Sequence, residues 1–272
     1  MKNRKNHLIM LLVVFTVLII LVIFSSRIFP HGNSLNMEET LAPPGGGHLF
    51  GTDNLGRDLL ERTFNGLKIS LALALIIQVL SLVSGAVIGA VAGYFGGIAD
   101  KIYLIVQNVL MSFPSIIAAL CLIAMLGAGI ETLVLALSAL GWVTYARLIR
   151  SEVLILKESD YILGARSVGA SNPYILFRYI LPNVVRPVIP MFTLMIGHTV
   201  LSISGLGFLG FGIQPPTPEI GMMIKDGITY ITRAPWVILF PGALLTIYVL
   251  CINLLGDELR EWFNPRKEMT IV

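Results

Sequence analysis

Six long stretches of the chain carry almost no charged residue, and polar segments of different lengths separate them. The uncharged stretches cover residues 8–26, 69–99, 102–130, 132–146, 187–218 and 234–256. A helix that crosses a bilayer needs roughly 20 mostly apolar residues. The stretch 132–146 is the shortest and would place Glu131 and Arg147 at the two membrane interfaces. The pattern therefore predicts an all-α membrane protein with six transmembrane helices.

The composition and the spacing of the polar segments divide the chain further. Of the 272 residues, 56% are hydrophobic and only 13% are charged, whereas soluble domains carry about a quarter charged residues. We expect an N-terminal tail and first span in 1–28, an external loop in 29–66, a five-helix core in 67–265 and a tail in 266–272. The basic start of the chain is also typical of a secretory signal, but no cleavage site follows, so we expect the first span to be retained.

The positions of lysine and arginine predict the orientation. If both termini are cytoplasmic, thirteen of the 19 basic residues lie on the inside, while the acidic residues divide evenly between the two sides. Cytoplasmic loops of membrane proteins are enriched in Lys and Arg. We therefore expect both termini in the cytoplasm of a bacterial cell, with a cytoplasmic loop at 150–182 and a second external segment at 219–233.

Two patches of small residues lie in the predicted spans. Gly85, Gly89 and Gly93 recur at every fourth position, a spacing that lets helix backbones approach closely. We expect this stripe to pack within one subunit rather than to form a dimer seam. A second patch at 202–212 leads into Gln214-Pro215-Pro216-Thr217-Pro218, which cannot continue a helix.

Motifs for catalysis and for nucleotide binding are missing from the sequence. It contains no H-E-x-x-H zinc motif and no G-x-x-x-x-G-K-[ST] phosphate loop. Acidic and basic residues occur in the predicted spans only near their ends, whereas ion-driven carriers usually bury such groups on the pathway. The polar residues left as candidates are Gln78, Asn108, His198 and Asn253, and we predict the first three for a transport pathway. We expect no catalysis and no cofactor on this chain, and nothing favours a nucleic-acid partner.

The polar segment between the fourth and fifth predicted spans is long for a loop. Asp160 is a plausible N-cap for a short helix that ends at Gly169. Asn172-Pro173 begins a second short helix, which would stop at Pro182. The aromatic and apolar residues of this pair suit either a docking surface for a protein or an amphipathic hairpin on the lipid headgroups.

This segment resembles the cytoplasmic loop of the permeases of ABC importers. The pattern of that family is Glu-Ala-Ala, a glycine four residues later, and Ile-x-Leu-Pro; here Leu163 and Gly164 stand at the acid and the first alanine. The resemblance implies docking on an ATPase through Asp160, Ala165, Arg166, Gly169, Ala170, Leu181 and Pro182. Because Leu163 lacks the charge, we expect a packed helix-in-groove contact centred on Ala165 and Gly169 instead of an ion pair.

Three further segments resemble the second permease subunit of the dipeptide, oligopeptide and nickel importers: 50–58, 205–219 and 253–260. The resemblance implies half of a pore, paired with a homologous permease, with ATP and Mg²⁺ in two separate ATPase subunits. An extracytoplasmic solute-binding protein would dock near Asp53, Arg57, Asp58 and Glu219. Taken alone, Arg57 beside the two aspartates is typical of a surface ion pair, which contributes little stability. Asp58 is also a plausible N-cap for the helix that leads into the second span.

The substrate stays open between nickel or a metal chelate and short peptides. His198 lies inside the fifth predicted span, and a neutral imidazole is a natural ligand for such a metal. A single histidine in a span is nevertheless more often a packed, hydrogen-bonded residue. The short external loop and tail resemble those of nickel-type members slightly more than those of oligopeptide-type members, so we rank nickel first and short peptides second. An ion-coupled carrier that acts alone is a remote third alternative.

Overall fold

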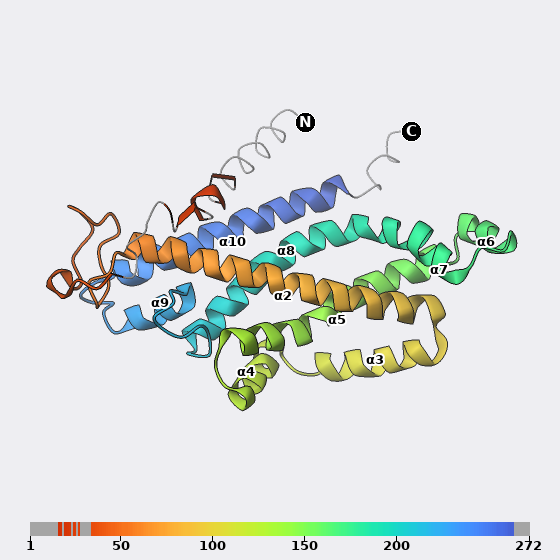
Figure 1. The fold of residues 1–272 in the computed structure, drawn as a ribbon, viewed down its shortest axis with the longest axis horizontal. Helices are drawn as coiled ribbons and strands as arrows, with labels where there is room; N and C mark the ends of the chain where they lie inside the picture. Colours follow the sequence, from red (N-terminus) through yellow and green to blue (C-terminus); the bar gives the residue numbers. More distant parts are fainter. Residues whose placement is uncertain (1–15, 18, 23, 26, 28–33, 264–272) are drawn as a thin grey trace.

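The computed structural model describes residues 16–17, 19–22, 24–25, 27 and 34–263 as a bundle of helices (Figure 1). Its long helices are α2 (Leu59–Phe95), α5 (Ile130–Leu156), α8 (Leu181–Phe208) and α10 (Trp236–Trp262). The shorter elements are η1 (Met37–Glu39), α3 (Gly97–Met111), α4 (Ser115–Leu126), α6 (Asp160–Ser167), α7 (Asn172–Ile175), η2 (Leu176–Ile180) and α9 (Ile220–Ile228). The prediction of an all-α protein is confirmed for this part of the chain.

The number of membrane crossings is settled only in part. Within the described ranges, 4 helices are long and apolar enough to cross a membrane, or up to 5 if the bent pair α3 and α4 is one span. The predicted first span, 8–26, lies largely outside the described residues, and the predicted tail 266–272 lies wholly outside them. The count of six spans therefore stays a prediction.

The predicted third span, 102–130, is not one straight helix. α3 and α4 meet at a bend of 85°. Pro114 has no backbone N–H and disfavours helical backbone in the residue before it, so α3 ends at Met111 and α4 starts afresh at Ser115. The break was not predicted, because the spans were assigned from the length of uncharged runs and proline is uncharged.

The connection between α5 and α8 is shorter than predicted. α5 continues through Arg147 to Leu156, and residues 172–208 form one continuous helical segment. The prediction that a second short helix stops at Pro182 is wrong. Pro182 falls in the first turn of α8, where a missing N–H costs little. Only 157–171, with α6 inside it, joins the two helices. At its other end the fifth predicted span stops at Phe208 instead of Pro218.

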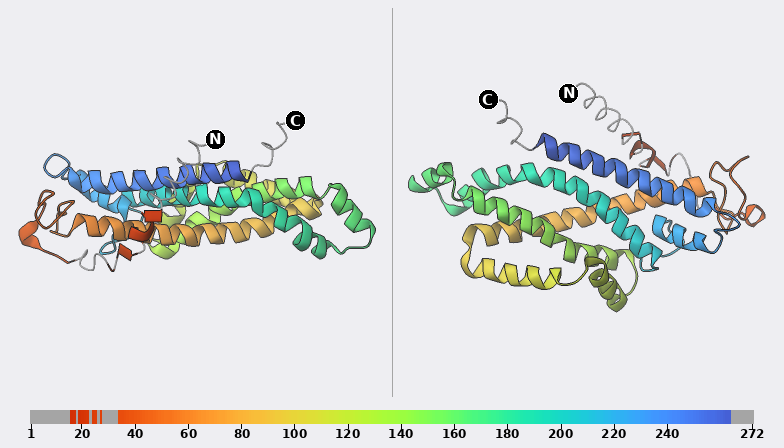
Figure 2. Two further views of the ribbon diagram at one scale, coloured as in Figure 1. Left: turned by 90° about the horizontal axis from the view of Figure 1, so that it is seen from above. Right: turned by 180° about the vertical axis from the view of Figure 1, so that it is seen from behind.

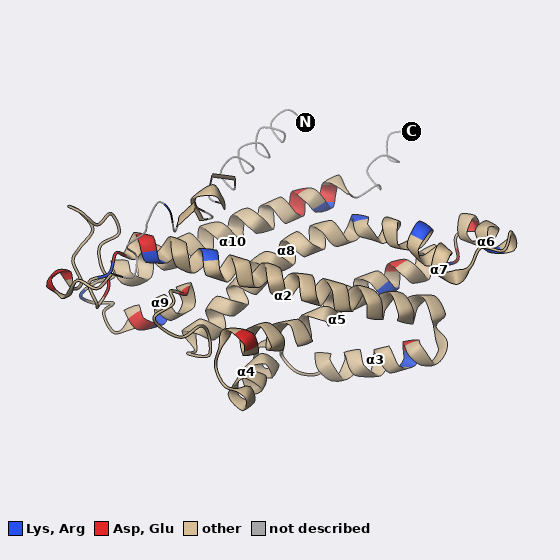
Figure 3. Cartoon of the chain, viewed as in Figure 1, with Lys and Arg blue, Asp and Glu red and all other residues tan. Residues whose placement is uncertain are grey.

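The bundle has two distinct ends. α6 and α7 lie at one end, while the loop 34–58 and α9 lie at the other (Figures 1 and 2). Charged residues gather towards these ends, and the middle of the bundle is mostly uncharged (Figure 3). This distribution matches a layer of hydrocarbon around the middle. We call the two regions the α6 end and the α9 end.

The glycine stripe of α2 is the site of its closest packing with α5. A methyl group added at Gly85 would lie 2.6 Å from the carbonyl oxygen of Trp142, and one added at Gly89 would lie 2.5 Å from that of Ala146. Both distances are shorter than any normal contact, so only glycine lets the two backbones come this near. The prediction that the stripe packs within one subunit is confirmed.

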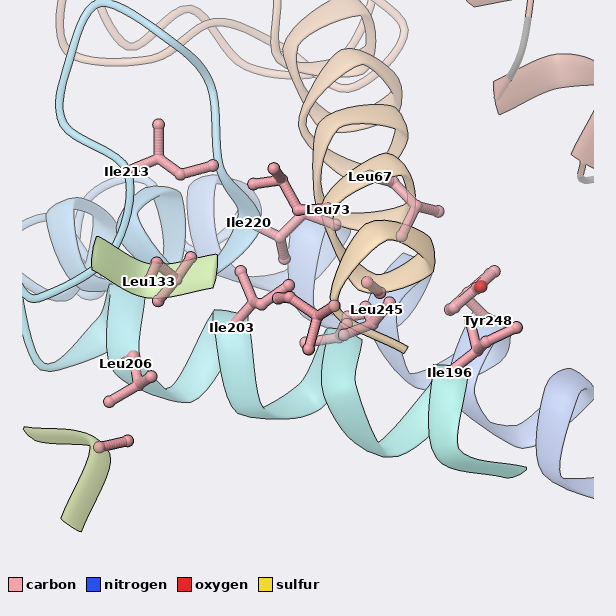
Figure 4. Close-up of a cluster of buried hydrophobic side chains, with 14 of the residues drawn as sticks. Leu67, Leu73, Leu133, Ile196, Ile203, Leu206, Ile213, Ile220, Leu245 and Tyr248 are labelled. Atoms are coloured by element: carbon pink, nitrogen blue, oxygen red, sulfur yellow. The ribbon is translucent and has the colours of Figure 1, made fainter. Parts of the chain in front are cut away.

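The largest hydrophobic cluster joins α2, α8 and α10 in the half of the bundle nearest the α9 end. Figure 4 shows members of this cluster, among them Leu67, Leu73, Ile203 and Leu245. Ile220, the first residue of α9, is fully buried in the same cluster. The short helix α9 is therefore part of the packed core rather than a segment lying free on the membrane surface.

Candidate functional site

The loop at the α6 end is anchored by isoleucines. Ile162 of α6, Ile175 and Ile180 are fully buried in one cluster, together with residues of α5. Ser159, and not Asp160 as predicted, occupies the N-cap position of α6, and Asp160 is its exposed first residue. Backbone geometry also helps to hold this loop, because the chain turns sharply just after α6 ends at Ser167.

Gly169 makes that turn, as predicted. Its φ is +87°, in the left-handed region that favours glycine, and its N–H donates to the carbonyl oxygen of Arg166 at 3.1 Å. A glycine in this conformation is a common way for a helix to end. The turn thus sets the direction in which the chain leaves α6 towards α7.

Three side-chain contacts tie the same loop to the end of α2. Lys157 Nζ donates to the carbonyl oxygen of Gly93 at 3.1 Å, and the Tyr94 hydroxyl donates to Asn172 Oδ1 at 2.9 Å. The guanidinium of Arg166 lies 6.0 Å from the centre of the Tyr94 ring. The loop thus contacts α2 on one side and continues α5 on the other, so a displacement of α6 acts on both helices.

The outer surface of this end is unusually apolar. Val168 is 84% exposed and Phe177 is 69% exposed, and Tyr161, Leu163 and Tyr174 are also exposed. Ala165, Ala170 and Leu181 are half-buried, while Arg166 and Pro182 are exposed. The accessible apolar surface is thus centred on Val168 and Phe177, whereas Ala165, one of the two predicted centres, faces partly inwards. Exposed apolar side chains at a polar end of a membrane protein are candidates for an interaction site.

A cavity of about 130 Å³ lies between α2, α4, α5 and α8. Gln78 and His198, two of the three residues predicted for a transport pathway, line it. Asn108 does not, because it lies on the exposed side of α3. The cavity is set among the apolar middles of the long helices, where polar side chains are costly and usually functional.

A buried hydrogen-bond network stands beside this cavity. Gln78 Nε2 donates to the hydroxyl of Thr199, and the Tyr145 hydroxyl donates to Gln78 Oε1 at 2.6 Å. These bonds join α2, α8 and α5 through side chains that are all buried. Thr199 and Tyr145 were not predicted from the sequence, because they carry neither a charge nor an amide and the pairing of distant helices leaves no local pattern.

Nothing in this cavity forms a metal site with His198. Among the described residues no group of three or more His, Cys, Asp or Glu side chains could hold a metal ion. His198 is exposed on α8 and is the only one of these residue types in the cavity lining. One imidazole falls short of the usual ligand count of a metal site, so the predicted metal role of His198 has no support in this part of the chain.

At the α9 end, Asp53 and Arg57 organise the loop 34–58 from within. Arg57 Nε donates to Asp53 Oδ2 at 2.7 Å, and Asp53 Oδ1 accepts from the backbone N–H groups of Leu55 and Arg57. The two residues are only 5% and 8% exposed, so the predicted surface ion pair is in fact buried. Asp58 caps α2 by accepting from Glu61 N–H at 2.9 Å, as predicted.

Glu219 is a fully buried carboxylate that fixes α9. It accepts from the N–H groups of Gly221 at 2.8 Å and Met222 at 2.9 Å, so it caps this helix. Burial raises the pKa of the Glu219 carboxyl above its ordinary value. The predicted docking of a binding protein on Asp53, Arg57 and Glu219 directly does not fit their burial. They shape the α9 end instead.

His48 links two acidic groups of the same loop. Its Nδ1 lies 2.7 Å from Asp58 Oδ2 and its Nε2 lies 3.1 Å from Glu39 Oε2. The hydrogen bond to Asp58, followed by that to Glu39, raises the pKa of His48 above 6.5. A group whose pKa is raised on folding contributes stability below its unfolded pKa and loses it as the pH rises through the folded pKa.

The loop 34–58 should therefore loosen as the pH rises above about 6.5. We expect backbone amide exchange in this loop, followed by mass spectrometry, to show a fall in protection beyond the intrinsic pH effect. His48→Gln should remove the pH-dependent part, because glutamine does not titrate. An identical pH profile in the wild type and in His48→Gln would contradict this assignment.

Comparisons with known proteins agree with the architecture. Residues 85–269 match a family described as binding-protein-dependent transport system inner membrane component. The chain is 35% identical over 265 residues to the dipeptide transport system permease protein DppC of Alkalihalophilus pseudofirmus, covering 97% of this chain and 87% of the relative. It is 38% identical over 266 residues to the glutathione transport system permease protein GsiD of Escherichia coli, covering 97% and 88%.

The solved structures give the same fold at lower sequence identity. The MetNI methionine ABC transporter, in an inward-facing conformation, matches with a TM-score of 0.59 and 21% identity over 76% of this chain and 96% of that chain. A putative peptide transport system permease protein of Brucella abortus is 37% identical over 258 residues, covering 93% of this chain and 87% of the relative. The relatives named here are described by dipeptides, glutathione or peptides, so they do not support nickel as the first-ranked substrate.

Proposed function

Because the chain belongs to the family of binding-protein-dependent transport system inner membrane components, we propose that it forms half of the pore of an ATP-driven importer of short peptides. We rank short peptides above nickel, since the relatives are named for peptides and His198 has no partner ligands for a metal among the residues that the structure describes. The chain is a multi-pass inner-membrane protein. We place both termini and the α6 end in the cytoplasm and the α9 end outside.

The observation that carries this proposal is the apolar surface at the α6 end. Val168 and Phe177 stand exposed on a loop that is itself anchored by Ile162. In the proposed complex an ATPase subunit covers this surface, and a second ATPase binds the homologous permease that completes the pore. ATP and Mg²⁺ are held by those subunits. Binding and closure of the ATPases shift the pore only through contacts that differ between its two states.

The α9 end then receives the extracytoplasmic binding protein. The buried residues Asp53, Arg57 and Glu219 support the surface of the α9 end, because they hold the loop 34–58 and α9 in place. Peptide released there enters a pathway that passes the membrane cavity between α2, α4, α5 and α8. Only one wall of that pathway belongs to this chain, and the homologous permease supplies the other.

Reconstitution tests the proposal directly. We expect proteoliposomes that contain both permeases, the ATPases and peptide-loaded binding protein to accumulate dialanine when ATP is supplied to the ATPase side. The same vesicles should not accumulate radioactive nickel, and this chain alone should transport neither. Uptake by the isolated chain would favour the ion-coupled carrier, and uptake of nickel without dialanine would refute the peptide assignment.

A further inference from the structure

The break between α3 and α4 places the beginning of a helix in the wall of the membrane cavity. Ser115 and Ile116, the first residues of α4, line the cavity, and no side chain caps this helix start. The first N–H groups of a helix have no partners inside it and carry a partial positive charge. In membrane transporters, interrupted helices present such ends to anionic groups of substrates.

The side chains around the same cavity independently offer hydrogen-bond donors. Thr199 is only 4% exposed, and its oxygen accepts from Gln78, which leaves its own proton for another acceptor. Thr144 adds a hydroxyl, and His198 adds an imidazole N–H. The lining contains no Asp or Glu among the described residues.

These groups discriminate between the two charged ends of a peptide. A carboxylate only accepts hydrogen bonds, and an ammonium group only donates them. A buried charge that lacks a partner of opposite sign is costly in a membrane interior. An ammonium group would meet the positive end of α4 and no carboxylate, whereas a carboxylate would meet several donors.

The size of the cavity fits a terminal group better than a whole peptide. Its volume is about 130 Å³, and one water molecule takes up about 30 Å³ in the liquid. A carboxylate with its neighbouring carbon atoms fits in such a space, while the rest of the peptide has to extend towards the other half of the pore.

We infer that this cavity receives the carboxylate end of the transported peptide, with the start of α4, Thr199 and His198 as its donors. The inference rests on the proposed peptide import and adds the orientation in which the peptide passes the middle of the membrane. His198 is the group to vary, because it is exposed on α8 and its replacement does not disturb the core.

The test compares His198→Lys with His198→Glu in the reconstituted four-component importer. Both variants place one charge at the same point of α8, so they carry a similar cost in the membrane. We expect saturating dialanine uptake by His198→Glu to be about tenfold or more below that by His198→Lys, because only the glutamate repels the carboxylate. Thr199→Val should lower uptake, and Thr193→Val, on the same helix but outside the cavity lining, should not.

Each result decides for or against the inference. If His198→Glu transports better than His198→Lys, the cavity takes the ammonium end. If both variants transport like the wild type, the cavity is not on the pathway. Assembly of each complex and its ATPase rate are measured alongside, so that misfolding is recognised and Thr199→Val remains as a second probe. A wild-type importer that takes up no peptide at all refutes the proposed function instead.

Discussion

Gly207→Ala should prevent α9 from docking and leave little assembled complex, whereas Gly205→Ala, two residues earlier on α8, should be tolerated. A methyl group at Gly207 would overlap Glu219 Oε2 and would lie 2.8 Å from Glu219 Cδ. At Gly205 the nearest atom is Ile116 Cδ1 at 3.8 Å, an ordinary contact. Overpacking in a core costs about 1–3 kcal/mol, and here it would also displace a buried carboxylate from the N-terminus of α9, where a cap contributes about 1 kcal/mol.

The measurement is the yield and the thermal unfolding midpoint of the purified complex for the two alanine variants. A double variant, Gly207→Ala with Glu219→Ala, adds a sharper control, since removal of the carboxylate makes room for the methyl group. We expect it to be more stable than the sum of the two single losses predicts. Equal stability of Gly205→Ala and Gly207→Ala would show that α9 does not depend on this contact.

Gly169→Pro should abolish ATP-driven peptide uptake while the permease still inserts into the membrane. Proline fixes φ near −65° and has no N–H, whereas Gly169 needs a φ of +87° and donates to the carbonyl oxygen of Arg166. The loop end of α6 would have to rearrange, and the exposed surface around Val168 would move with it. Transport should fall to background because ATPase closure no longer reaches the helices.

Gly164→Ala is the matched control for this variant. Gly164 lies inside α6, and neither Gly164 nor Gly169 has an atom within 4 Å of the added carbon. The difference between the two variants therefore comes from the backbone and not from crowding. Uptake, ATP hydrolysis and the amount of permease in the membrane are measured together. Normal uptake by Gly169→Pro would show that this loop is not the element that transmits ATPase closure.

The features that were predicted correctly are set by residues that lie close together in the sequence. The cap at Asp58, the turn at Gly169 and the close packing of the glycine stripe each follow from a residue type at a defined place in a helix. The helix break at Pro114 was not predicted, because the residues around it are as apolar as those of an unbroken span. A search for proline inside apolar runs would have located it.

The features that could not be predicted bring together distant segments. Gln78 meets Thr199 across 121 residues of sequence, and Glu219 is buried because α8 and α9 fold against each other around Gly207. The burial of Glu219 results from this tertiary contact, which local sequence does not reveal. For that reason Glu219 was predicted to lie on a docking surface. At the α6 end, the most exposed apolar side chains are Val168 and Phe177 rather than Ala165, because the orientation of each helix decides which side chains face outwards.

The length of α2 gives the glycine stripe a mechanical consequence. This helix has 37 residues, which correspond to about 55 Å of continuous rod. One tip touches the α6 loop through Tyr94, and the other begins at the cap Asp58, beside His48. Because the stripe packs this helix closely against α5, we expect the two helices to move as one rigid unit. In the proposed importer, a tilt imposed on the α6 end would then reach the α9 end directly, without local rearrangement of the helices in between.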